Sequence, residues 1–420
     1  MSEQAQYNAS SPFSQNMVVS KYRRLKTWPI VSKPISSRRE FLAGKSAAQA
    51  LGGALAGPPQ ELPAPKTVGA EPGSHLISVS REAMACLFEV VFDAATYRDG
   101  AEAAVAALEL VDALEAQLTV YRENSEVSEI NRRAGAEAVV VEERLFDMFV
   151  RAGELYEATA GAFDITAGHL SKIWGFYRRQ GQMPSPAEVA GALASVGGKH
   201  LALDPAAHTI RFLQPGLEIN LGAIGKGYAL DRLAAALCEG GVRDFLIHGG
   251  NSSVLARGQR ILDFGLPILD SEDEQSTQSK FQNPKSKIPP GWTIALRHPL
   301  KPETRLAEFF LRNQALGTSG SGTQFFHHQG KRYGHILDPR TGWPADQVLS
   351  ATVIAPTAEQ ADALSTALYV MGLPAAETFC SKRPEIAALL VTQTSAAGGI
   401  ELHPINLPDD AWRRLERPNG

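Results

Sequence analysis

The segment EINLGAIGKGYALDRLAAAL, residues 218–237, contains the change from strand to helix that decides the fold. Apolar residues alternate at its start, and from Lys226 they recur at helical spacing up to the glycine pair 240–241, which is typical of a helix end. A lysine at a helix N-terminus favours an anion, and small residues beside it let the backbone approach a ligand closely. These small residues are Gly222, Gly225 and Gly227. Close packing of a helix on a strand explains the same pattern, and both interpretations stay open.

From residue 75 onward, strands and helices mix without a regular βαβ repeat. Alternation and short apolar runs predict the strands, and helical spacing of apolar residues predicts the helices. Besides the segment above, strands are expected within 75–94 (a strand pair), 244–250 and 350–356, and helices within 100–121, 145–163 and 358–372. This order favours an α+β fold over a doubly wound α/β fold. The polar segment 269–291 is expected to be an inserted surface loop, and residues 406–420 a C-terminal tail.

Charge is distributed unevenly along the 420 residues. Residues 1–56 carry eight Lys and Arg against two Glu, a charge of +6, and the remainder carries 33 basic and 43 acidic residues, a charge of −10. A body this acidic argues against nucleic acid as a partner, because phosphate binding needs clustered Lys and Arg. The three cysteines, Cys86, Cys238 and Cys380, lie far apart, which argues against a disulfide framework or a structural zinc site.

The first 56 residues have the composition of an export signal. The pair Arg38-Arg39 precedes a short apolar run rich in Ala and Gly, which ends in Ala-Leu-Ala at 54–56. This order resembles a twin-arginine signal, which exports proteins already folded. A basic tail with a chance arginine pair is the alternative. The run is too short to span a bilayer stably, and residues 57–74, rich in Pro and Gly, are expected to be a linker.

Two further loops consist of small residues: IHGGNSS at 247–253, a glycine turn after a predicted strand, and ALGTSGSGTQ at 315–324, with hydroxyl and glycine residues. Three such loops in one chain favour a phosphate-bearing ligand over ordinary turns. Asp362 and Thr366 lie four residues apart on a predicted helix and therefore share one face. Together with carbonyl or phosphate oxygens, this pair suits a hard cation such as Mg²⁺. In the competing interpretation, Thr366 faces the core and Asp362 is a solvated acid in the first helical turn.

The stretch GHILDPRTGWPAD, residues 334–346, concentrates polar groups around a Pro/Gly turn. It fits either a turn with polar decoration or the edge of an active site, where the loop holds His335 against a substrate. A second stretch, GAFDITAGHLSKIWGF at 161–176, places aromatic residues near Asp164. Aromatic side chains of this kind most often lie in a core, and in another role they flank a flat heterocycle.

The motifs occur in a distinctive order. They are Met84, Y-x-x-x-S-E-x-S-x-I-N at 121–131, G-x-F-D-I-T at 161–166, W-G-F at 174–176, L-G-A-I-x-K-G-Y-A-x-D at 221–231, G-G-N at 249–251, T-S-G at 318–320, H-I-x-D-P-x-T-G-x-P at 335–344 and A-D-A-L-S-T-A-L at 361–368. This order closely resembles the ApbE family of FAD:protein FMN transferases. The resemblance covers about residues 75–400. Each motif is modest by itself, but their number and order argue against coincidence.

The resemblance implies an α+β, T-fold-related architecture over residues 75–405, with mixed sheets and packed helices around a central FAD cleft. It also implies a reaction: with Mg²⁺, the diphosphate of FAD is cleaved, FMN is joined through a phosphoester to a threonine or serine of an exported flavoprotein, and AMP is released. By similarity, Asp362, Thr366 and the backbone carbonyl of Ala223 would hold the metal. The residues that would hold FAD are Met84, Tyr121, Ala162, Phe163, Asp164, Asn220, Lys226 and Ile336.

His335 is the candidate catalytic base. A hydroxyl that attacks phosphorus must lose a proton, and an imidazole that titrates near neutrality suits this task. We therefore expect His335 to accept this proton, or at least to position the acceptor. The acceptor flavoprotein that the resemblance implies is exported. The expected location is accordingly the periplasm or the outer face of the cytoplasmic membrane, with no stable transmembrane span.

The chain departs from the family pattern at several positions. Asn220 stands where the family usually has aspartate, so one negative charge near the metal is missing. The usual M-G-T is Met84-Ala85-Cys86, Ser321-Gly322 follows the T-S-G loop in place of an acid and an aromatic, and the usual lipid-anchor cysteine is absent. Because the metal pair and the histidine are present, an active transferase is expected. The alternatives are an FAD pyrophosphatase, which uses water as the acceptor, and a non-catalytic FAD-binding protein.

Overall fold

In the computed structural model, the residues described are 17–18, 75–258, 291–320, 322, 324–395 and 398–415. The expected export signal and linker lie outside the described residues apart from 17–18, and the expected inserted loop lies outside them apart from Gly291.

An eight-stranded sheet forms the centre of the fold, and neighbouring strands pair antiparallel throughout it. In spatial order its strands are β16 (Ile400–Ile405), β15 (Ala387–Gln393), β14 (Ser350–Ala355), β11 (Gln314–Gly320), β8 (Ser253–Arg257), β7 (Phe245–Gly249), β3 (Cys86–Asp93) and β2 (Leu76–Ala83). The predicted strand pair at 75–94 is therefore confirmed as β2 and β3. The register places Ser253 of β8 opposite Gly317 of β11, which fixes two of the small-residue loops at one end of the sheet.

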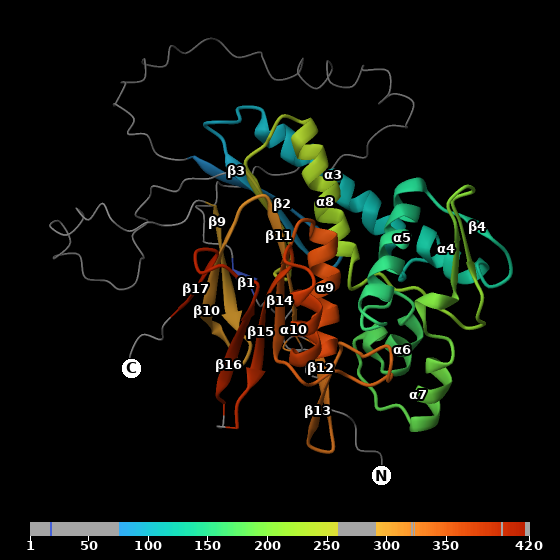
Figure 1. The fold of residues 1–420 in the computed structure, drawn as a ribbon. Helices are drawn as coiled ribbons and strands as arrows, with labels where there is room; N and C mark the ends of the chain where they lie inside the picture. The colour runs from blue at the N-terminus through green and yellow to red at the C-terminus, as the bar shows by residue number, and fades with distance from the viewer. Residues whose placement is uncertain are drawn as a thin grey trace, which may run out of the picture. The chain divides into compact units, whose positions relative to one another are not determined.

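Three helices lie side by side against this sheet (Figure 1): α3 (Gly100–Leu118), α8 (Gly225–Glu239) and α9 (Ala358–Met371). Their apolar stripes close the main core, which includes the fully buried Val111 of α3, Leu230 of α8 and Leu368 of α9. Helix α8 contacts both of the other helices, so the segment that begins at Lys226 lies at the centre of the layer. A shorter helix, α10 (Leu373–Ser381), follows α9.

A separate four-stranded sheet consists, in spatial order, of β1 (Met17–Val18), β9 (Trp292–His298), β10 (Lys301–Leu311) and β17 (Trp412–Arg414). Strand β17 lies within residues 406–420, which the sequence analysis assigned to a tail. Arg413 of β17 donates from Nε to the carboxylate of Glu308 in β10 over 2.8 Å. This pairing partner is more than one hundred residues away in the sequence, so local patterns do not reveal the strand.

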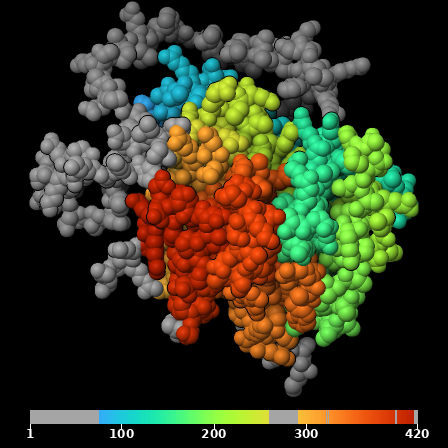
Figure 2. All heavy atoms as spheres, viewed as in Figure 1, coloured from blue at the N-terminus to red at the C-terminus, as the bar shows by residue number. Residues whose placement is uncertain are grey.

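The segment between α3 and α8 forms a group of short elements beside α9 (Figure 1). Its elements are α4 (Glu126–Arg133), α5 (Glu143–Ala158), α6 (Gly168–Ile173), η1 (Phe176–Arg178), α7 (Pro186–Leu193), η2 (Gly198–His200) and a sheet of β4 (Val139–Val140), β6 (Thr209–Phe212) and β5 (Leu201–Asp204). Helix α5 is joined to α9 because Arg151 donates two hydrogen bonds, of 2.7 and 2.8 Å, to Glu359. The space-filling view shows the two regions in direct contact (Figure 2).

A small aromatic core lies under the hairpin of β12 (Phe325–His328) and β13 (Lys331–Gly334). Trp174, Phe176 and Phe326 are buried in it, and the indole of Trp174 donates to the carbonyl of Gly342 over 2.8 Å. The interpretation of Trp174 and Phe176 as core residues is thus confirmed. The same contact ties the turn of residues 338–342 to this core.

The fold is α+β, as the sequence predicted. The helices expected within 100–121, 145–163 and 358–372 are α3, α5 and α9, and the strands expected within 244–250 and 350–356 are β7 and β14. An isolated bridge between Ala167 and Glu218 is parallel. In the part of the chain that the structure describes, we find no helix long and apolar enough to cross a membrane.

Helices α8 and α9 cross at Gly227, where a Cβ atom would lie 2.1 Å from the carbonyl oxygen of Ala358. We expect Gly227→Ala to destabilise the protein by about 1–3 kcal/mol, because the helices must separate even though alanine favours helix formation. Gly153 of α5 is a matched control, since a Cβ there meets no atom within 4 Å, and Gly153→Ala should stabilise by up to about 1 kcal/mol. Urea unfolding of both variants measures the difference. Equal stability of the two variants would contradict the close crossing.

Candidate active site

The carboxylate of Asp362 is the centre of a buried polar group. Asp362 is only 4% exposed; its Oδ1 accepts a hydrogen bond from Oγ of Ser253 over 2.8 Å, and its Oδ2 accepts one from the amide of Gly227 over 3.1 Å. Nζ of Lys226 lies 3.7 Å from Oδ2 and partly balances its charge. The interpretation of Asp362 as a solvated acid is therefore wrong, because the helix packs this face against α8 and the sheet.

Hydroxyl groups gather one helical turn further along α9. Oγ of Ser319 lies 3.0 Å from Oγ1 of Thr366 and 3.0 Å from Oγ of Ser365. Strand β8 begins at Ser253 and its antiparallel neighbour β11 ends at Gly320, so the hydroxyls of Ser253 and Ser319 lie at the same end of the sheet. Sequence reasoning noticed both loops but singled out neither serine, since small hydroxyl residues are common in turns.

The three small-residue loops thus meet at one place, and the first of them contains a carbonyl that accepts no backbone hydrogen bond from a described residue. Helix α8 begins at Gly225, so the amide of Gly227 lies in its first turn, where amides lack an intrahelical acceptor, and it donates to Asp362 instead. Among the backbone bonds between described residues, none ends on the Ala223 carbonyl. This carbonyl, the Asp362 carboxylate and the Thr366 hydroxyl are all hard oxygen donors.

A second carboxylate holds α9 in place. The side chain of Asp231 in α8 accepts hydrogen bonds from the amides of Ala358 and Glu359, over 3.0 and 2.8 Å, at the start of α9. Burial raises the pKa of Asp231 to about 6, and the two amide bonds oppose this shift. The first turn of α9, and with it Asp362, is therefore fixed relative to Lys226 and Gly227 by contacts within the protein.

The ApbE family profile matches residues 84–390, a segment that contains all of the groups just described. The chain belongs to the ApbE family. The resemblance seen in the sequence is confirmed, and the matched segment begins at Met84, the first of the expected FAD-binding residues.

Known members of the ApbE family show the same relationship. The FAD:protein FMN transferase of Salmonella typhimurium is 30% identical over 322 residues, which cover 75% of this chain and 83% of that protein. The Escherichia coli K12 enzyme of the same name is 30% identical over 290 residues, 67% of this chain and 74% of that protein. Among solved structures, the ApbE protein of Thermotoga maritima is 28% identical, with a TM-score of 0.63 over 79% of this chain and 97% of its own. The flavin transferase ApbE of Vibrio cholerae shares the fold, with 23% identity, a TM-score of 0.63 and coverage of 79% and 98%.

His335, from the family's H-I-x-D-P segment, is held by one backbone carbonyl. The carbonyl of Gln324 accepts from the backbone amide of His335 and from its Nδ1, each over 3.1 Å. Nδ1 therefore carries the proton, and Nε2 keeps its lone pair. Burial lowers the pKa of His335 to about 4, and the positive charges of Lys226 and Arg332 add to this effect. The expectation that this imidazole titrates near neutrality is therefore wrong. The fold buries the ring, and the sequence alone does not show this burial.

Three of the expected FAD-binding residues of this ApbE chain lie at turns. The ring of Tyr121 is exposed, and its centroid lies 4.7 Å from that of Tyr177. Met84 adopts a positive φ of 49° in the β2–β3 turn, and its amide donates to Glu115 over 3.0 Å. The side-chain oxygen of Asn220 accepts from the amide of Gly222 over 2.8 Å, so the asparagine still shapes the loop in which an aspartate is usual.

Of the remaining expected FAD-binding residues, Ala162, Phe163 and Ile336 are buried, and Asp164 and Lys226 are half-buried. Ala162 and Phe163 are each 1% exposed, and Ile336 is 8% exposed. The carboxylate of Asp164 accepts from the amide and hydroxyl of Thr166, over 2.8 and 2.7 Å, and burial raises its pKa. Their contact with FAD stays a prediction.

Proposed function

We propose that this chain transfers FMN from FAD to a threonine or serine hydroxyl of an exported flavoprotein, forming a phosphoester and releasing AMP. The observation that carries the proposal is the convergence of Lys226, the Asp362–Thr366 pair and three small-residue loops in a member of the ApbE family. A diphosphate is strongly anionic, so its cleavage needs cationic and hydrogen-bonding groups in such a place.

Mg²⁺ fits the donor set of this site. Asp362, Thr366 and the carbonyl of Ala223 would hold the ion, and Mg²⁺ characteristically takes one or two carboxylates together with substrate phosphates. Among the described residues, no three His, Cys, Asp or Glu side chains come together, so an ion that needs several carboxylate or imidazole ligands fits less well. When bound, the ion would neutralise charge on the diphosphate.

The protein's own residues would place the reacting groups. The ammonium of Lys226, 26% exposed, faces the same carboxylate and offers positive charge to the diphosphate. In the transfer, the acceptor oxygen bonds to the phosphorus of the FMN half, the bond to the AMP phosphate breaks, and the hydroxyl proton leaves to a base. Nε2 of His335 is available for that proton, because the Gln324 carbonyl occupies the Nδ1 side. Its low pKa makes it a weak base, so orienting the hydroxyl is a substantial part of its role.

The exposed Tyr121 and the half-buried Tyr177 together supply a surface for a flat ring. Tyr177 is fixed because its hydroxyl donates to the carbonyl of Val120 over 2.8 Å, and the ammonium of Lys172 lies 5.2 Å from the centre of its ring. Stacking on an aromatic side chain contributes about 0.5–1.5 kcal/mol beyond burial. We assign this pair to the flavin or adenine of FAD.

One incubation separates the proposed transfer from its alternatives. The protein is mixed with FAD, Mg²⁺ and a candidate flavoprotein domain, and the products are resolved after denaturation. Flavin fluorescence that stays with the acceptor supports transfer. Free FMN with an unmodified acceptor would instead identify a pyrophosphatase, and unchanged FAD would identify a binding protein.

Ser253 gives a test of how Asp362 is held. Ser253→Ala removes the hydrogen bond to Oδ1, and such bonds to charged groups contribute about 1.5–3 kcal/mol. We expect transfer to fall roughly 10-fold or more, with a higher Mg²⁺ concentration needed for half-maximal rate. Ser252→Ala is the matched control, because the Ser252 hydroxyl contacts that of Ser253 and not the carboxylate. Identical Mg²⁺ dependence in both variants would contradict the role of the Ser253 hydroxyl in holding Asp362.

We propose export through the twin-arginine route on the basis of the Arg38-Arg39 pair, the apolar run and the Ala-Leu-Ala sequence. Replacing both arginines with lysine should leave the folded protein in the cytoplasm, because that route recognises the arginine pair. Fractionation of cells that express each form measures the outcome. Normal export of the double variant would reject the twin-arginine assignment.

A further inference from the structure

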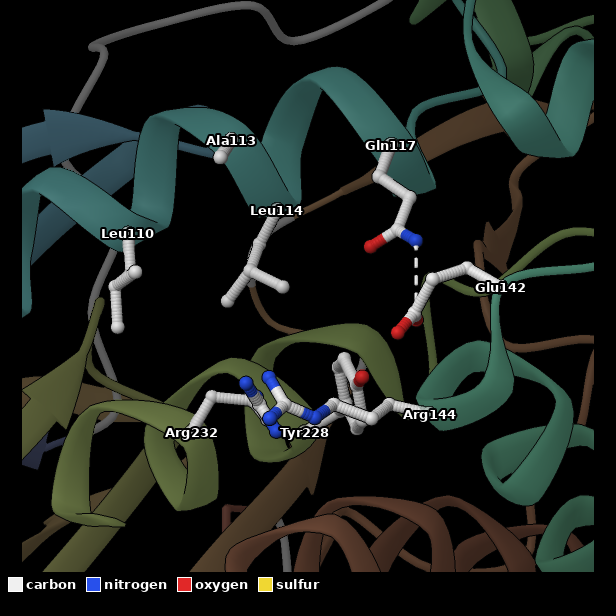
Figure 3. Close-up of a pocket in the computed structure, with 8 residues that line it drawn as sticks. All are labelled: Leu110, Ala113, Leu114, Gln117, Glu142, Arg144, Tyr228 and Arg232. Atoms are coloured by element: carbon white, nitrogen blue, oxygen red, sulfur yellow. Dashed lines mark hydrogen bonds between the residues drawn. The ribbon is translucent and has the colours of Figure 1, made fainter. Parts of the chain in front are cut away.

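A pocket of about 420 Å³ lies between α3 and α8, away from the group around Asp362. Leu110 and Leu114 of α3 line one wall, Tyr228 and Arg232 of α8 line the other, and Glu142 and Arg144 at the start of α5 close one end (Figure 3). Successive helical residues are about 100° apart, so Tyr228 lies roughly 200° around α8 from Lys226. The pocket and the proposed active site are thus on opposite sides of the same helix.

The pocket is lined by two arginines, Arg144 and Arg232, and by one acid, Glu142, so its lining carries a net positive charge. Neither Arg144 nor Arg232 has a carboxylate within ion-pair distance among the residues that the structure describes. Glu142 already accepts from the amide of Leu145 over 3.0 Å and from the side-chain amide of Gln117 over 3.5 Å. Two guanidinium groups therefore face the pocket with their donors available.

Tyr228 adds a directed neutral donor. Its side chain is almost fully buried, at 3% residue exposure, yet its hydroxyl points into the space between α3 and α8 (Figure 3). Among the described residues, this hydroxyl is not one of the buried side-chain atoms that lack a hydrogen-bond partner. Because it opens onto the pocket, it can donate a hydrogen bond to a ligand there.

Size and lining define the class of ligand. The volume exceeds what a bare phosphate fills and falls within the range of about 300–1,000 Å³ that is typical of small-molecule sites. Leu110 and Leu114 offer an apolar wall opposite the arginines. The exposed outer face of α3 carries Glu102 and Glu109, which would repel an anionic lipid surface or an acidic protein. A small molecule that reaches into the pocket fits better.

We propose that this pocket is a second ligand site, separate from the proposed FAD site, which binds a small organic oxyanion: a phosphate monoester or a carboxylate with an apolar group. The oxyanion contacts Arg144, Arg232 and the Tyr228 hydroxyl, and the apolar group lies on Leu110 and Leu114. Guanidinium groups suit both kinds of oxyanion because they can donate two parallel hydrogen bonds.

Titration calorimetry of the purified full chain tests this site with phenyl phosphate, benzoate and inorganic phosphate as probes. We expect phenyl phosphate or benzoate to bind one molecule per chain, more tightly than inorganic phosphate. Arg232→Ala and Arg144→Ala should each weaken that binding roughly 10-fold or more, since a charged hydrogen bond is lost. Both variants should keep wild-type FMN transfer and wild-type urea unfolding.

Two controls locate the binding. Lys226→Ala changes the proposed FAD site and should leave probe affinity unchanged, and so should Arg211→Ala, which removes an exposed arginine on β6. Probe affinity lost in Lys226→Ala but kept in both pocket variants would place the probes in the FAD site and overturn the proposal. If neither phenyl phosphate nor benzoate binds, the proposal is overturned as well.

Discussion

Replacement of Asp362 with alanine is expected to lower FMN transfer by roughly 10³-fold or more. The change removes the carboxylate proposed to hold Mg²⁺ and leaves the ammonium of Lys226, 3.7 Å away, without its counter-charge. It also leaves the Ser253 hydroxyl and the Gly227 amide without an acceptor, which costs about 1–3 kcal/mol for each buried group. Single-turnover transfer at several Mg²⁺ concentrations measures the loss.

A second variant separates this chemical effect from unfolding. Asp362→Asn keeps the shape of the side chain and an oxygen that accepts hydrogen bonds, but it lacks the charge that attracts a cation. We expect it to retain most of the stability lost by the alanine variant and still to lose at least 10²-fold in transfer. Urea unfolding monitors the fold of both variants. Wild-type transfer by the folded asparagine variant would exclude Asp362 as a metal ligand.

The second large effect is expected at His335. His335→Ala should reduce transfer by roughly 10²–10⁴-fold, the usual loss when a proton-accepting group is removed, while FAD affinity stays close to that of the wild type. His327→Ala on the same hairpin is the matched control, since this exposed side chain packs against Phe325, 5.4 Å between ring centres. If His335 only supported the turn, its variant would lose activity in proportion to its unfolded fraction.

The lowered pKa of His335 sets the expected pH dependence. With a pKa of about 4, Nε2 stays unprotonated from pH 8 down to about 5, so the transfer rate should be flat in this range with respect to this group. It should fall below that range as the lone pair takes up a proton. The folded pKa lies below the unfolded value of about 6.5, so the contribution of His335 to stability is present above pH 6.5 and is lost as pH falls toward 4. A rate that drops near pH 6.5 in the wild type, and not in His335→Ala, would contradict this burial.

The sequence predicted those features that depend on local periodicity. The strand pair β2–β3 and the helices α3, α8 and α9 follow from the spacing of apolar residues, and the i, i+4 relation placed Asp362 and Thr366 on one face. The side chains that contact this face of α9 come from β8 and β11, more than forty residues away in the sequence. Local patterns therefore could not predict that Ser253 contacts Asp362 or that Ser319 contacts Thr366. The pKa of His335 likewise depends on burial and on Lys226, which only the tertiary structure brings near.

The most direct test of the proposed function compares two products in one reaction. A flavoprotein domain that carries the target threonine or serine is incubated with the protein, FAD and Mg²⁺, and its Thr/Ser→Ala variant is incubated in parallel. The AMP released and the flavin bound covalently to the acceptor are then measured. Transfer predicts equal amounts of the two, little free FMN, and neither product with the alanine acceptor. AMP formed with an equal amount of free FMN on both acceptors, or no AMP at all, would contradict it.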